Sequence, residues 1–311
     1  MGYIYEALQR IEEERKAAPT SVPTSSGNGF AGADAVGGSE LLRALRELDP
    51  SPTAIVPDEP ALQERPVFQS INATRISEDS RLVTLTDPSG LGAEKFRVLA
   101  TRLKNMQQKR PLKRLLITSS IVQEGKSLVS SNLAITLARH ELQRVLLIDG
   151  DLRKPVMANR FGLTNRAGLT EFLLGDRPAE QFIYHLENLG VDLMPAGTIP
   201  ENPLELLQSP KLRSMLTRMS TLFAWIIIDS PPLVPVADAN VWGRVTDGML
   251  LVTRQGVTER KMLEKGLKPL DNPALLGVVF NGSTDSHPHY YYYSRERVRR
   301  KFKGSTSEPL S

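Results

Sequence analysis

The stretch that decides the fold is "LLITSSIVQEGKSLVSSNLAITLARH", residues 115–140. Its first residues are apolar and match a short strand, a polar loop follows, and the apolar residues after "GKS" recur at the spacing of a helix. Outward from this stretch, further short apolar runs alternate with helical segments: "RVLLIDGD" (144–151), "VDLMPAG" (191–197), "WIIIDSPP" (225–232), "GMLLVTR" (248–254) and "LLGVVFNG" (275–282). Strands that are apolar throughout are buried on both faces. The pattern therefore predicts an α/β fold with a mostly parallel sheet flanked by helices on both faces.

The loop in the opening stretch has the features of a phosphate-binding loop (P-loop). Between a strand and a helix, backbone N–H groups and the helix N-terminus favour an anion. Gly125 lets the backbone approach phosphates, Lys126 reaches the outer phosphates, and Ser127 offers its hydroxyl to magnesium. The loop departs from the general pattern because Ser120 replaces the first glycine. A "GKS" after a strand can also be a simple helix start, so further evidence has to come from the other strands.

Acidic residues stand at the carboxyl ends of two further predicted strands. Asp149 and Asp151 end "RVLLIDGD", and Asp229 lies in "WIIIDSPP". Open α/β sheets bind their ligands at this edge. A single aspartate there is an ordinary cap or turn residue. Three of them beside a P-loop can supply the charge neutralisation, alignment and base that phosphoryl transfer from Mg-ATP requires.

The composition of the 311 residues excludes several classes of protein. A hydrophobic share of 40%, a charged share of 24% and a net charge of +4 show no bias toward nucleic-acid binding. The absence of cysteine excludes disulfides, thiolate nucleophiles and Cys-based zinc sites, and no metal is expected beyond one bound with a nucleotide. The apolar runs are shorter than the roughly 18 residues of a membrane span. The sequence therefore predicts a cytoplasmic or peripheral protein.

The chain divides into three parts by composition. Residues 1–90 are expected to be an appendage, with short amphipathic helices at 3–17 and after Ser39 and a flexible Pro-, Ser- and Gly-rich linker over 19–38. The compact domain is expected to span 91–285. Residues 286–311 form a tail that contains the tyrosine cluster and a basic end.

The tail places four tyrosines directly before a basic segment. Tyr290, Tyr291, Tyr292 and Tyr293 are followed by "SRERVRRKFK". One interpretation is an unstructured tail whose aromatic residues pack casually on the domain. The other is a set of phosphorylation sites, with the adjacent arginines able to pair with the phosphates. The same basic residues could instead contact anionic lipid headgroups.

These motifs together resemble the bacterial tyrosine kinases (BY-kinases) of capsule and exopolysaccharide systems, a branch of the P-loop ATPases related to MinD and ParA. The family's nucleotide motifs are similar to residues 120–127, "LLIDGDLR" (146–153) and "IIIDSPP" (226–232), and further matches are "NPLELL" (202–207), "ADA" (237–239) and "GVVFNG" (277–282). The resemblance covers roughly residues 91–293, including the cluster where the family carries its autophosphorylation sites. It implies a P-loop NTPase fold of the MinD/ParA-like branch and an ATP-dependent protein-tyrosine autokinase that regulates capsule or exopolysaccharide synthesis or export.

The resemblance also implies roles for individual residues. Lys126 would hold the β and γ phosphates of ATP, and Ser127 would ligate Mg²⁺. Asp149 would assist the metal and act as the base for the tyrosine hydroxyl, with Asp151 in support, and Asp229 would be the second carboxylate on the metal side. The other nucleotide-binding positions are Ser120, Gln123, Glu124, Gly125, Leu128, Arg153 and Asn281, the last of which lies where the family contacts adenine.

Several positions differ from the family or leave alternatives open. Val122 and Gln123 replace the usual Pro-Gly of the loop. Arg153 could stabilise phosphates or an intersubunit contact, or form a surface ion pair. In "EKFRVLA" (94–100), which resembles the family's oligomerisation stretch, Ala100 replaces the last arginine, and Arg102 lies nearby as a possible substitute. Self-association as a ring or a dimer therefore stays open.

The resemblance further implies partners. No membrane-spanning domain is fused to the chain, so a separate membrane-anchored polysaccharide co-polymerase is expected to activate it at the inner face of the plasma membrane. A cognate tyrosine phosphatase is expected, and nucleic acid is not.

The main alternative is an ATPase switch of the ParA/MinD type without tyrosine kinase activity. Such proteins usually carry an additional lysine early in the P-loop, where this sequence has Ile121. The tyrosine cluster would also have no purpose in such a switch. A third interpretation is a degenerate scaffold that binds nucleotide weakly and works through its tails.

Overall fold

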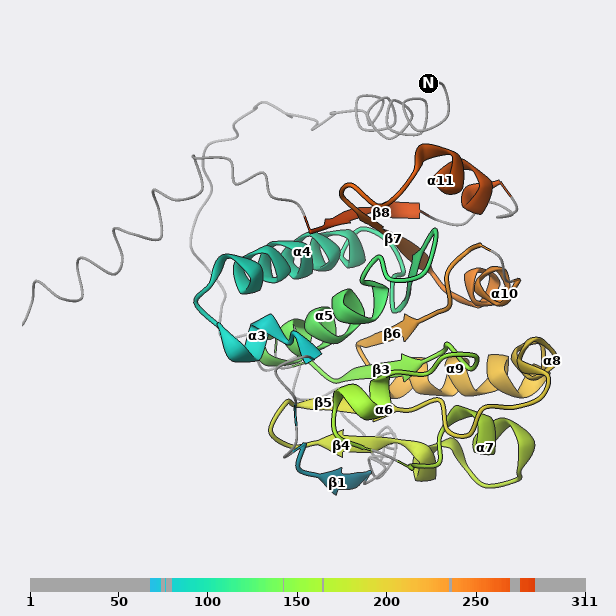
Figure 1. Cartoon of the computed structure of the whole chain (residues 1–311). Helices are drawn as coiled ribbons and strands as arrows, with labels where there is room; N and C mark the ends of the chain where they lie inside the picture. Colours follow the sequence, from blue (N-terminus) through green and yellow to red (C-terminus); the bar gives the residue numbers. More distant parts are fainter. Residues whose placement is uncertain are drawn as a thin grey trace, which may run out of the picture. The chain divides into compact units, whose positions relative to one another are not determined.

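The computed structural model describes residues 68–73, 76, 80–141, 143–163, 165–234, 237–268 and 275–282. Within these ranges the chain forms one eight-stranded sheet with helices on both faces (Figure 1). The predicted α/β fold with a mostly parallel, helix-flanked sheet is therefore confirmed. The predictions about the N-terminal helices, the linker and residues 290–293 concern positions outside the described ranges.

The sheet has the strand order β1-β4-β5-β3-β6-β2-β7-β8. Its strands are Gln69–Ile71 (β1), Arg114–Ser119 (β2), Val145–Asp149 (β3), Tyr184–Leu186 (β4), Val191–Met194 (β5), Trp225–Asp229 (β6), Gly248–Arg254 (β7) and Leu275–Asn281 (β8). All neighbouring strands run parallel except β4 and β5, which are antiparallel. The three strands whose ends carry the P-loop and the aspartates, β2, β6 and β3, are thus direct neighbours.

Helices cover the two faces of the sheet as separate groups. They are Val83–Thr86 (α3), Leu91–Gln107 (α4), Lys126–Glu141 (α5), Met157–Arg160 (α6), Leu169–Leu174 (α7), the 3₁₀ helix Ala179–Phe182 (η2), Pro203–Leu207 (α8), Pro210–Leu222 (α9), Asp238–Val245 (α10) and Arg260–Leu267 (α11). One hydrophobic cluster joins the sheet to α4, α5 and α6, and a second joins it to α7, η2, α8, α9 and α10. These two main clusters form the halves of the core, and the sheet lies between them.

The central strands serve both halves of the core because successive side chains point to opposite faces. In β6, Ile227 belongs to the cluster with α5, whereas Ile226 and Ile228 belong to the cluster with α9. All three are fully buried. This explains why the sequence of these strands is apolar throughout instead of alternating.

Strand register sets the position of the acidic residues. Asp229, the last residue of β6, pairs with Asp149 of β3 on one side and with Ile117 of β2 on the other. Since these strands are parallel, the loop after β2 begins beside both carboxylates. The sheet therefore brings the predicted phosphate loop and the predicted aspartates to one edge.

The sheet also includes residues that the sequence analysis assigned to the N-terminal appendage. β1 pairs in parallel with β4 and forms the edge of the sheet. The side chain of Asn188 fixes the chain just after β1, because it accepts a hydrogen bond from Ala73 N–H at 3.2 Å and donates one to the Ala73 carbonyl at 3.1 Å. Leu82 is fully buried in the same core half as α5.

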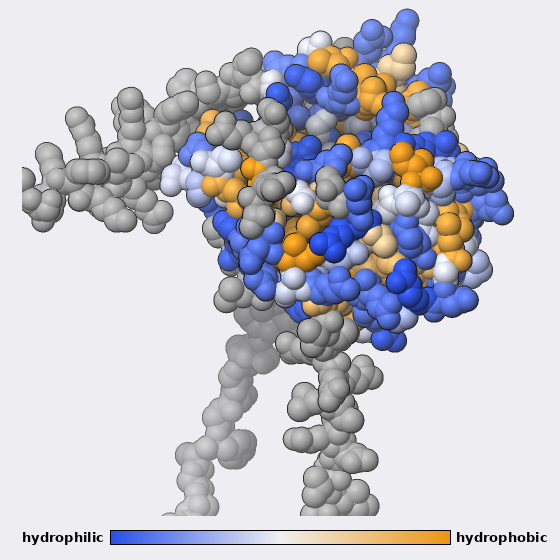
Figure 2. Space-filling view, turned by 60° about the horizontal axis from the view of Figure 1, so that its bottom comes forward, coloured by the Kyte–Doolittle hydropathy of each residue, from blue (hydrophilic) through white to orange (hydrophobic). Residues whose placement is uncertain are grey.

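The surface is mixed in polarity. Figure 2 shows one face of the molecule, on which hydrophobic residues form separate patches among hydrophilic ones. The large hydrophobic residues exposed in the described part of the chain are Leu91, Val122, Leu174, Ile199, Val257, Val278 and Phe280. Among the described residues, no helix has the length and apolar character needed to cross a membrane.

Helix α4 carries the stretch compared with the family's oligomerisation motif. Two charged residues of this stretch pair with each other, because Arg97 and Glu94 form an ion pair at 2.6 Å. Arg97 also donates a hydrogen bond to the carbonyl of Pro88 at 2.9 Å. Ala100 is only 3% exposed and belongs to the core between α4 and α5. The small residue at this position is therefore part of the helix packing.

We expect Ala100→Arg to destabilise the protein, because the long charged side chain would have to enter a packed core. Overpacking alone costs about 1–3 kcal/mol, and thermal unfolding of the purified protein would measure the loss as a fall of several degrees in Tm. Thr101→Arg, one residue away and exposed, is the matched control and should leave Tm nearly unchanged. Equal Tm values for the two variants would contradict the packing role of Ala100.

Candidate active site

The P-loop lies between β2 and α5 and closes tightly against the end of β8. Gly125 has a φ of +100°, a conformation that favours glycine. A Cβ atom at this position would lie 2.0 Å from Nδ2 of Asn281. That amide group in turn donates a hydrogen bond to the carbonyl of Glu124 at 2.9 Å. Glycine is thus required here both by the backbone angle and by the approach of Asn281.

Side chains from the β7 end hold the loop from the other side. Glu124 is fully buried, and its carboxylate accepts hydrogen bonds from Ile121 N–H at 2.9 Å and from the hydroxyl of Thr258. Thr258 itself accepts a hydrogen bond from Arg254 N–H at 2.8 Å. We call Glu124, Thr258 and Asn281 the loop clamp. It fixes the P-loop through contacts from the segment that follows β7 and from the end of β8.

Gln123 occupies a strained position in the same loop. Its φ is +65°, in the left-handed region that glycine adopts more easily than other residues. Arg254 Nη1 donates a hydrogen bond to the carbonyl of Gln123 at 3.4 Å. This contact to the loop backbone helps to hold Gln123 in its conformation.

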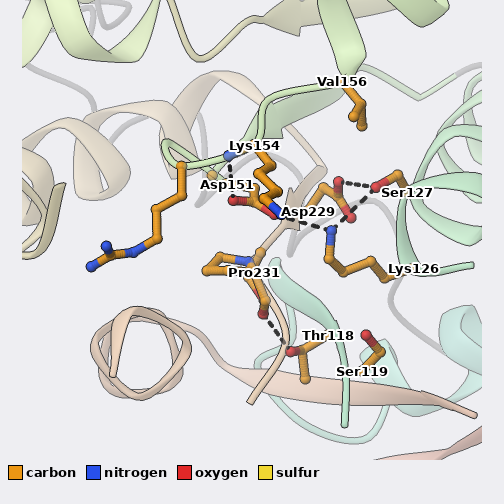
Figure 3. Close-up of polar contacts among 12 residues, drawn as sticks. Thr118, Ser119, Lys126, Ser127, Asp151, Lys154, Val156, Asp229 and Pro231 are labelled. Atoms are coloured by element: carbon orange, nitrogen blue, oxygen red, sulfur yellow. Dashed lines mark hydrogen bonds and ion pairs between the residues drawn. The ribbon is translucent and has the colours of Figure 1, made fainter. Parts of the chain in front are cut away.

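Lys126 and Ser127 bring the first turn of α5 to two of the predicted aspartates (Figure 3). Nζ of Lys126 lies 3.1 Å from Oδ2 of Asp151. Oγ of Ser127 donates a hydrogen bond to Oδ2 of Asp229 at 2.6 Å, and Oγ of Ser130 donates one to Oδ1 of Asp229 at 3.0 Å. Asp229 is completely buried, so these hydroxyls provide much of its stabilisation.

Asp149 is turned toward the start of α6. Its Oδ2 accepts hydrogen bonds from the N–H groups of Val156 at 3.0 Å and Met157 at 2.9 Å. Its Oδ1 accepts a longer one, 3.4 Å, from Asp151 N–H. Burial raises the pKa of Asp149 to about 7, and the nearby Asp229 adds to this effect. The carboxyl group can therefore take up and release a proton near neutral pH.

The cluster contains one lysine and three carboxylates, and their charges shift each other's pKa values. Burial alone would lower the pKa of Lys126, but Asp229, Asp151 and Asp149 outweigh it and raise the value. Burial raises the pKa of Asp229, although Lys126 and the two serine hydroxyls oppose the shift. The excess of negative charge makes the cluster attractive to a cation.

The donor set fits Mg²⁺ bound together with phosphates. Among the described residues, no group of three or more His, Cys, Asp or Glu side chains is placed to hold a metal by itself. Mg²⁺, however, is usually held by one or two carboxylates together with substrate phosphates and water. Ser127 and Asp229 would provide one hydroxyl and one carboxylate next to the phosphate loop.

A cavity of ≈ 740 Å³ opens over the P-loop. It is lined by Arg81, Val122, Gln123, Gly125, Lys126, Ser127, Leu128, Asp151, Arg153, Lys154, Val156, Arg160, Pro231, Pro232, Arg254, Asn281 and Gly282. Basic side chains in this lining outnumber the single carboxylate, which suits a polyphosphate ligand. The size is that of a pocket for a small molecule.

Most of the predicted binding residues line this cavity, and a few lie beneath it. Ser120 and Glu124 are fully buried and absent from the lining. Oγ of Ser120 has no hydrogen-bond partner within the part of the chain that the structure describes. Asp149 and Asp229 are likewise buried below the cavity floor. They can reach a ligand only through small movements or through a metal ion.

Arg153 forms the ion pair that the sequence analysis gave as one of its alternatives. Its Nε and Nη2 atoms lie 2.7 Å and 3.0 Å from the two carboxylate oxygens of Asp238. This bidentate pair raises the pKa of Arg153. Asp238 belongs to the "ADA" stretch and is fully buried at the start of α10. The motif thus serves to orient an arginine at the cavity.

Sequence reasoning missed the residues that come from distant parts of the chain. Arg254 and Thr258 contact the P-loop from more than 130 positions away, as the sequence separations of 131 and 134 show. The cavity lining also includes Arg81, Lys154 and Arg160, none of which belongs to a sequence motif. The only available signal was the position of Thr258 and Lys154 just beyond predicted strands.

Comparisons with known proteins give the family. The tyrosine-protein kinase YwqD of Bacillus subtilis (strain 168) is 36% identical over 228 residues, which is 71% of this chain and 96% of YwqD. The chain belongs to the bacterial tyrosine kinases. The tyrosine-protein kinase Etk of Escherichia coli (strain K12) is 33% identical over 202 residues, which cover 64% of this chain but only 28% of Etk. No family model matches the chain.

Solved structures agree with this assignment. The kinase domain of Escherichia coli tyrosine kinase ETK matches with a TM-score of 0.63 and 29% identity, over 74% of this chain and 84% of the domain. The chimerical protein CapA2B2 matches with a TM-score of 0.61 and 28% identity, over 69% of this chain and 93% of the chimera. The predicted family and the predicted enzyme class, a nucleotide-binding protein-tyrosine kinase, are therefore confirmed.

We expect Thr258→Val to weaken ATP binding, because it removes the hydroxyl that the buried Glu124 depends on. The KM for ATP should rise about three- to tenfold, which corresponds to roughly 1 kcal/mol, while kcat changes little. Thr258→Ser keeps the hydroxyl and is the control. Steady-state kinetics at varied ATP would measure both. An unchanged KM in the valine variant would show that the loop clamp is dispensable.

We expect Asp149→Asn to stabilise the nucleotide-free protein at pH 8 while abolishing kinase activity. The pKa of Asp149 is raised from 3.8 to about 7 in the folded state, so its protonation stabilises the fold. This contribution is complete below about pH 4 and is lost as the pH rises through 7. The variant mimics the protonated form and should be more stable by about 2–4 kcal/mol at pH 8, with a clearly smaller gain at pH 5 and none below about pH 4.

Urea unfolding at the two pH values would measure this difference. Glu94→Gln, an exposed carboxylate on α4, serves as the control and should show no such pH-dependent gain. A stability difference that is the same at pH 5 and pH 8 would be inconsistent with a proton bound by Asp149.

Proposed function

We propose that the protein is an autokinase that transfers the γ-phosphoryl group of Mg-ATP to its own Tyr290, Tyr291, Tyr292 and Tyr293. The observation that carries the proposal is the convergence of Lys126, Ser127, Asp151 and Asp229 under one cavity in a chain of the bacterial tyrosine kinase family. A family kinase needs a tyrosine acceptor, and the chain supplies four in its tail.

ATP would lie along the cavity with its phosphates on the P-loop. Loop N–H groups and the N-terminus of α5 would hold the phosphates, and the adenine would lie toward Asn281. Lys126 is already close to this position and would exchange part of its contact with Asp151 for the β and γ phosphates. Ser127 and Asp229 would hold Mg²⁺, which neutralises the developing charge when bound.

Asp149 would act as the base. In the transfer, a tyrosine oxygen forms a bond to the γ phosphorus, the bond from that phosphorus to the β–γ bridging oxygen breaks, and ADP leaves. The tyrosine proton passes to a carboxylate oxygen of Asp149. A carboxyl group with a pKa near 7 is suited to this task, because a base works best when its pKa is close to the operating pH.

The proposal includes the partners and location that the family resemblance implies. A separate membrane-anchored polysaccharide co-polymerase would activate the kinase at the inner face of the plasma membrane, and a cognate phosphatase would remove the phosphates. Copies of the chain would associate so that the tail of one enters the site of another. Residues up to about 67 and beyond 285 would act as appendages of the kinase domain, and the output would be control of capsule or exopolysaccharide synthesis.

Incubation of the purified protein with Mg-ATP, followed by phosphotyrosine detection and site mapping, tests this function. Label should appear within residues 290–293 in the wild type. It should fall at least about 100-fold in Lys126→Met, because a preorganised charge is lost, and should vanish in the variant with all four tyrosines changed to phenylalanine. Lys109→Met, at an exposed lysine after α4, controls for the loss of a positive charge.

One outcome would contradict the proposal directly. If the wild type hydrolyses ATP but forms no phosphotyrosine, even with a membrane activator fragment added, the tail is not the acceptor. The ATPase switch considered in the sequence analysis would then explain the protein better.

A further inference from the structure

Three basic side chains line the cavity on the side opposite the proposed adenine position. Lys154 and Arg160 follow β3, and Arg81 comes from the segment before α3. Asn281 ends β8, and the strand order places β3 and β8 on opposite sides of β2, whose end begins the P-loop. The cavity therefore extends past the phosphate loop in two directions. One direction suits the nucleotide base, and the other ends at these three cations, which we call the distal basic cluster.

The backbone that carries the cluster is fixed against α5. The side chain of Asn132 donates a hydrogen bond to the carbonyl of Arg81 at 3.1 Å and accepts two from Thr84, at its N–H and its hydroxyl, both at 3.1 Å. Arg81 has a φ of +50°, which is strained for a residue other than glycine. Arg160 donates a hydrogen bond from Nη1 to the carbonyl of Ser80. The two arginines are thus held on neighbouring, well-anchored segments.

The distal basic cluster differs from the other cations of the cavity in its lack of ion-pair partners among the described residues. Other cations of the cavity have partners, since Lys126 pairs with Asp151 and Arg153 pairs with Asp238. Within the described residues, the three side chains of the cluster form no ion pair with a carboxylate. The buried Nε–H of Arg160 also lacks a hydrogen-bond partner among the described residues. Arg160 therefore lines the cavity with a guanidinium group whose donors are only partly used.

The cluster also lies near the reacting end of the site. Burial lowers the pKa of Arg160, Asp229 and Asp149 oppose that shift, and Arg81 adds to it. Arg160 and Arg81 also line the same cavity as Lys126 and Asp151. A ligand bound there would therefore lie beside the γ-phosphate and the acceptor hydroxyl.

Phosphate is the group that this chemistry fits. Guanidinium groups bind phosphate oxygens through two parallel hydrogen bonds, and an ammonium group adds charge. The phosphates of ATP are already served by the P-loop and Lys126. A second phosphate must come from the other substrate.

The tail offers such a phosphate only after it has reacted once. Before reaction its tyrosines are neutral and are followed by "SRERVRRKFK", which the cluster would repel. Each phosphotyrosine adds about −1.5 to −2 charges. In an extended segment, side chains two residues apart lie on the same side, about 7 Å from each other. A phosphotyrosine can therefore contact the cluster while the tyrosine two positions away reaches the acceptor position.

We propose that Arg81, Lys154 and Arg160 form a phosphotyrosine subsite that binds a tail phosphate while another tyrosine of the same tail is phosphorylated. This inference rests on the proposed autokinase function and adds that the first and the later phosphoryl transfers to a tail differ in rate. The first transfer to a tail is slow, because the subsite repels a basic peptide. Later transfers are faster, because the subsite then attracts the peptide. Tails should accordingly accumulate with several phosphates or with none.

Two synthetic peptides of residues 286–298 test the proposal, one unmodified and one with phosphate on Tyr292. The enzyme is the full chain with its own four tail tyrosines changed to phenylalanine, so that it cannot label itself. With Mg-ATP, we expect kcat/KM about tenfold higher for the phosphopeptide, which corresponds to one or two charge-assisted hydrogen bonds. Equal values for the two peptides would overturn the subsite.

Variants test whether the preference for the phosphopeptide depends on the distal basic cluster. Arg81→Gln combined with Arg160→Gln should bring the ratio of the two kcat/KM values close to one, whatever change it causes in the rate with the unmodified peptide. Arg160→Lys keeps the charge but loses the fork and should give an intermediate ratio. Arg110→Gln, an exposed arginine after α4, is the matched control and should keep the full ratio. A preference that survives in the double variant would also overturn the subsite, and an unchanged Tm would show that this variant is folded.

Equilibrium binding separates this proposal from the function it rests on. Fluorescence anisotropy with Mg-ADP present measures the affinity of each peptide without phosphoryl transfer, and the phosphopeptide should bind about tenfold more tightly. If neither peptide is phosphorylated but this preference is observed and depends on Arg160, the tail autokinase proposal fails and the subsite stands. If both peptides react equally and bind equally, the autokinase stands and the subsite fails.

Discussion

The buried carboxylate of Asp229 is the point on which the site depends. It ends the central strand β6, accepts hydrogen bonds from Ser127 and Ser130 of α5, and lies opposite Asp149 in β3. A completely buried carboxylate without such partners would cost several kcal/mol. Those contacts therefore determine how α5 sits on the sheet, and with it the position of the P-loop. The chemistry of the site and the packing of its supporting helix use the same atoms.

The clustering of carboxylates lowers the stability of the nucleotide-free fold while it prepares the site for its function. Three aspartates surround one lysine, and two of them are fully buried. Burial and mutual repulsion keep the pKa of Asp149 near 7, so the folded protein holds a proton that an unfolded chain would release. Bound Mg-ATP would relieve the same repulsion. The fold thus stores part of the free energy that a nucleotide complex would recover.

Much of the fold followed from local patterns, because buried parallel strands are apolar throughout and cannot be mistaken for alternating ones. The P-loop and the aspartates were identifiable for a related reason, since they stand directly after those strands. What the sequence did not reveal depends on contacts between distant segments. The pairing of β1 with β4, the contact of Thr258 with Glu124 and the approach of Arg81 to Arg160 have no local signature. Ala100 is a third kind of case, because its identity reflects packing against α5 more than any surface function.

The contact between Asn281 and Gly125 places the end of strand β8 at the wall of the cavity itself. Tyr290 follows Gly282 by eight residues, so the first tyrosine can lie no farther than about 29 Å from that wall. Transfer between copies, as proposed above, therefore requires the cavity of the neighbouring copy to lie within the reach of this short connection. Any other protein offering a tyrosine would have to compete with this tethered segment. The length of the connection would then act as a filter on outside substrates, independent of any contact that they make with the kinase.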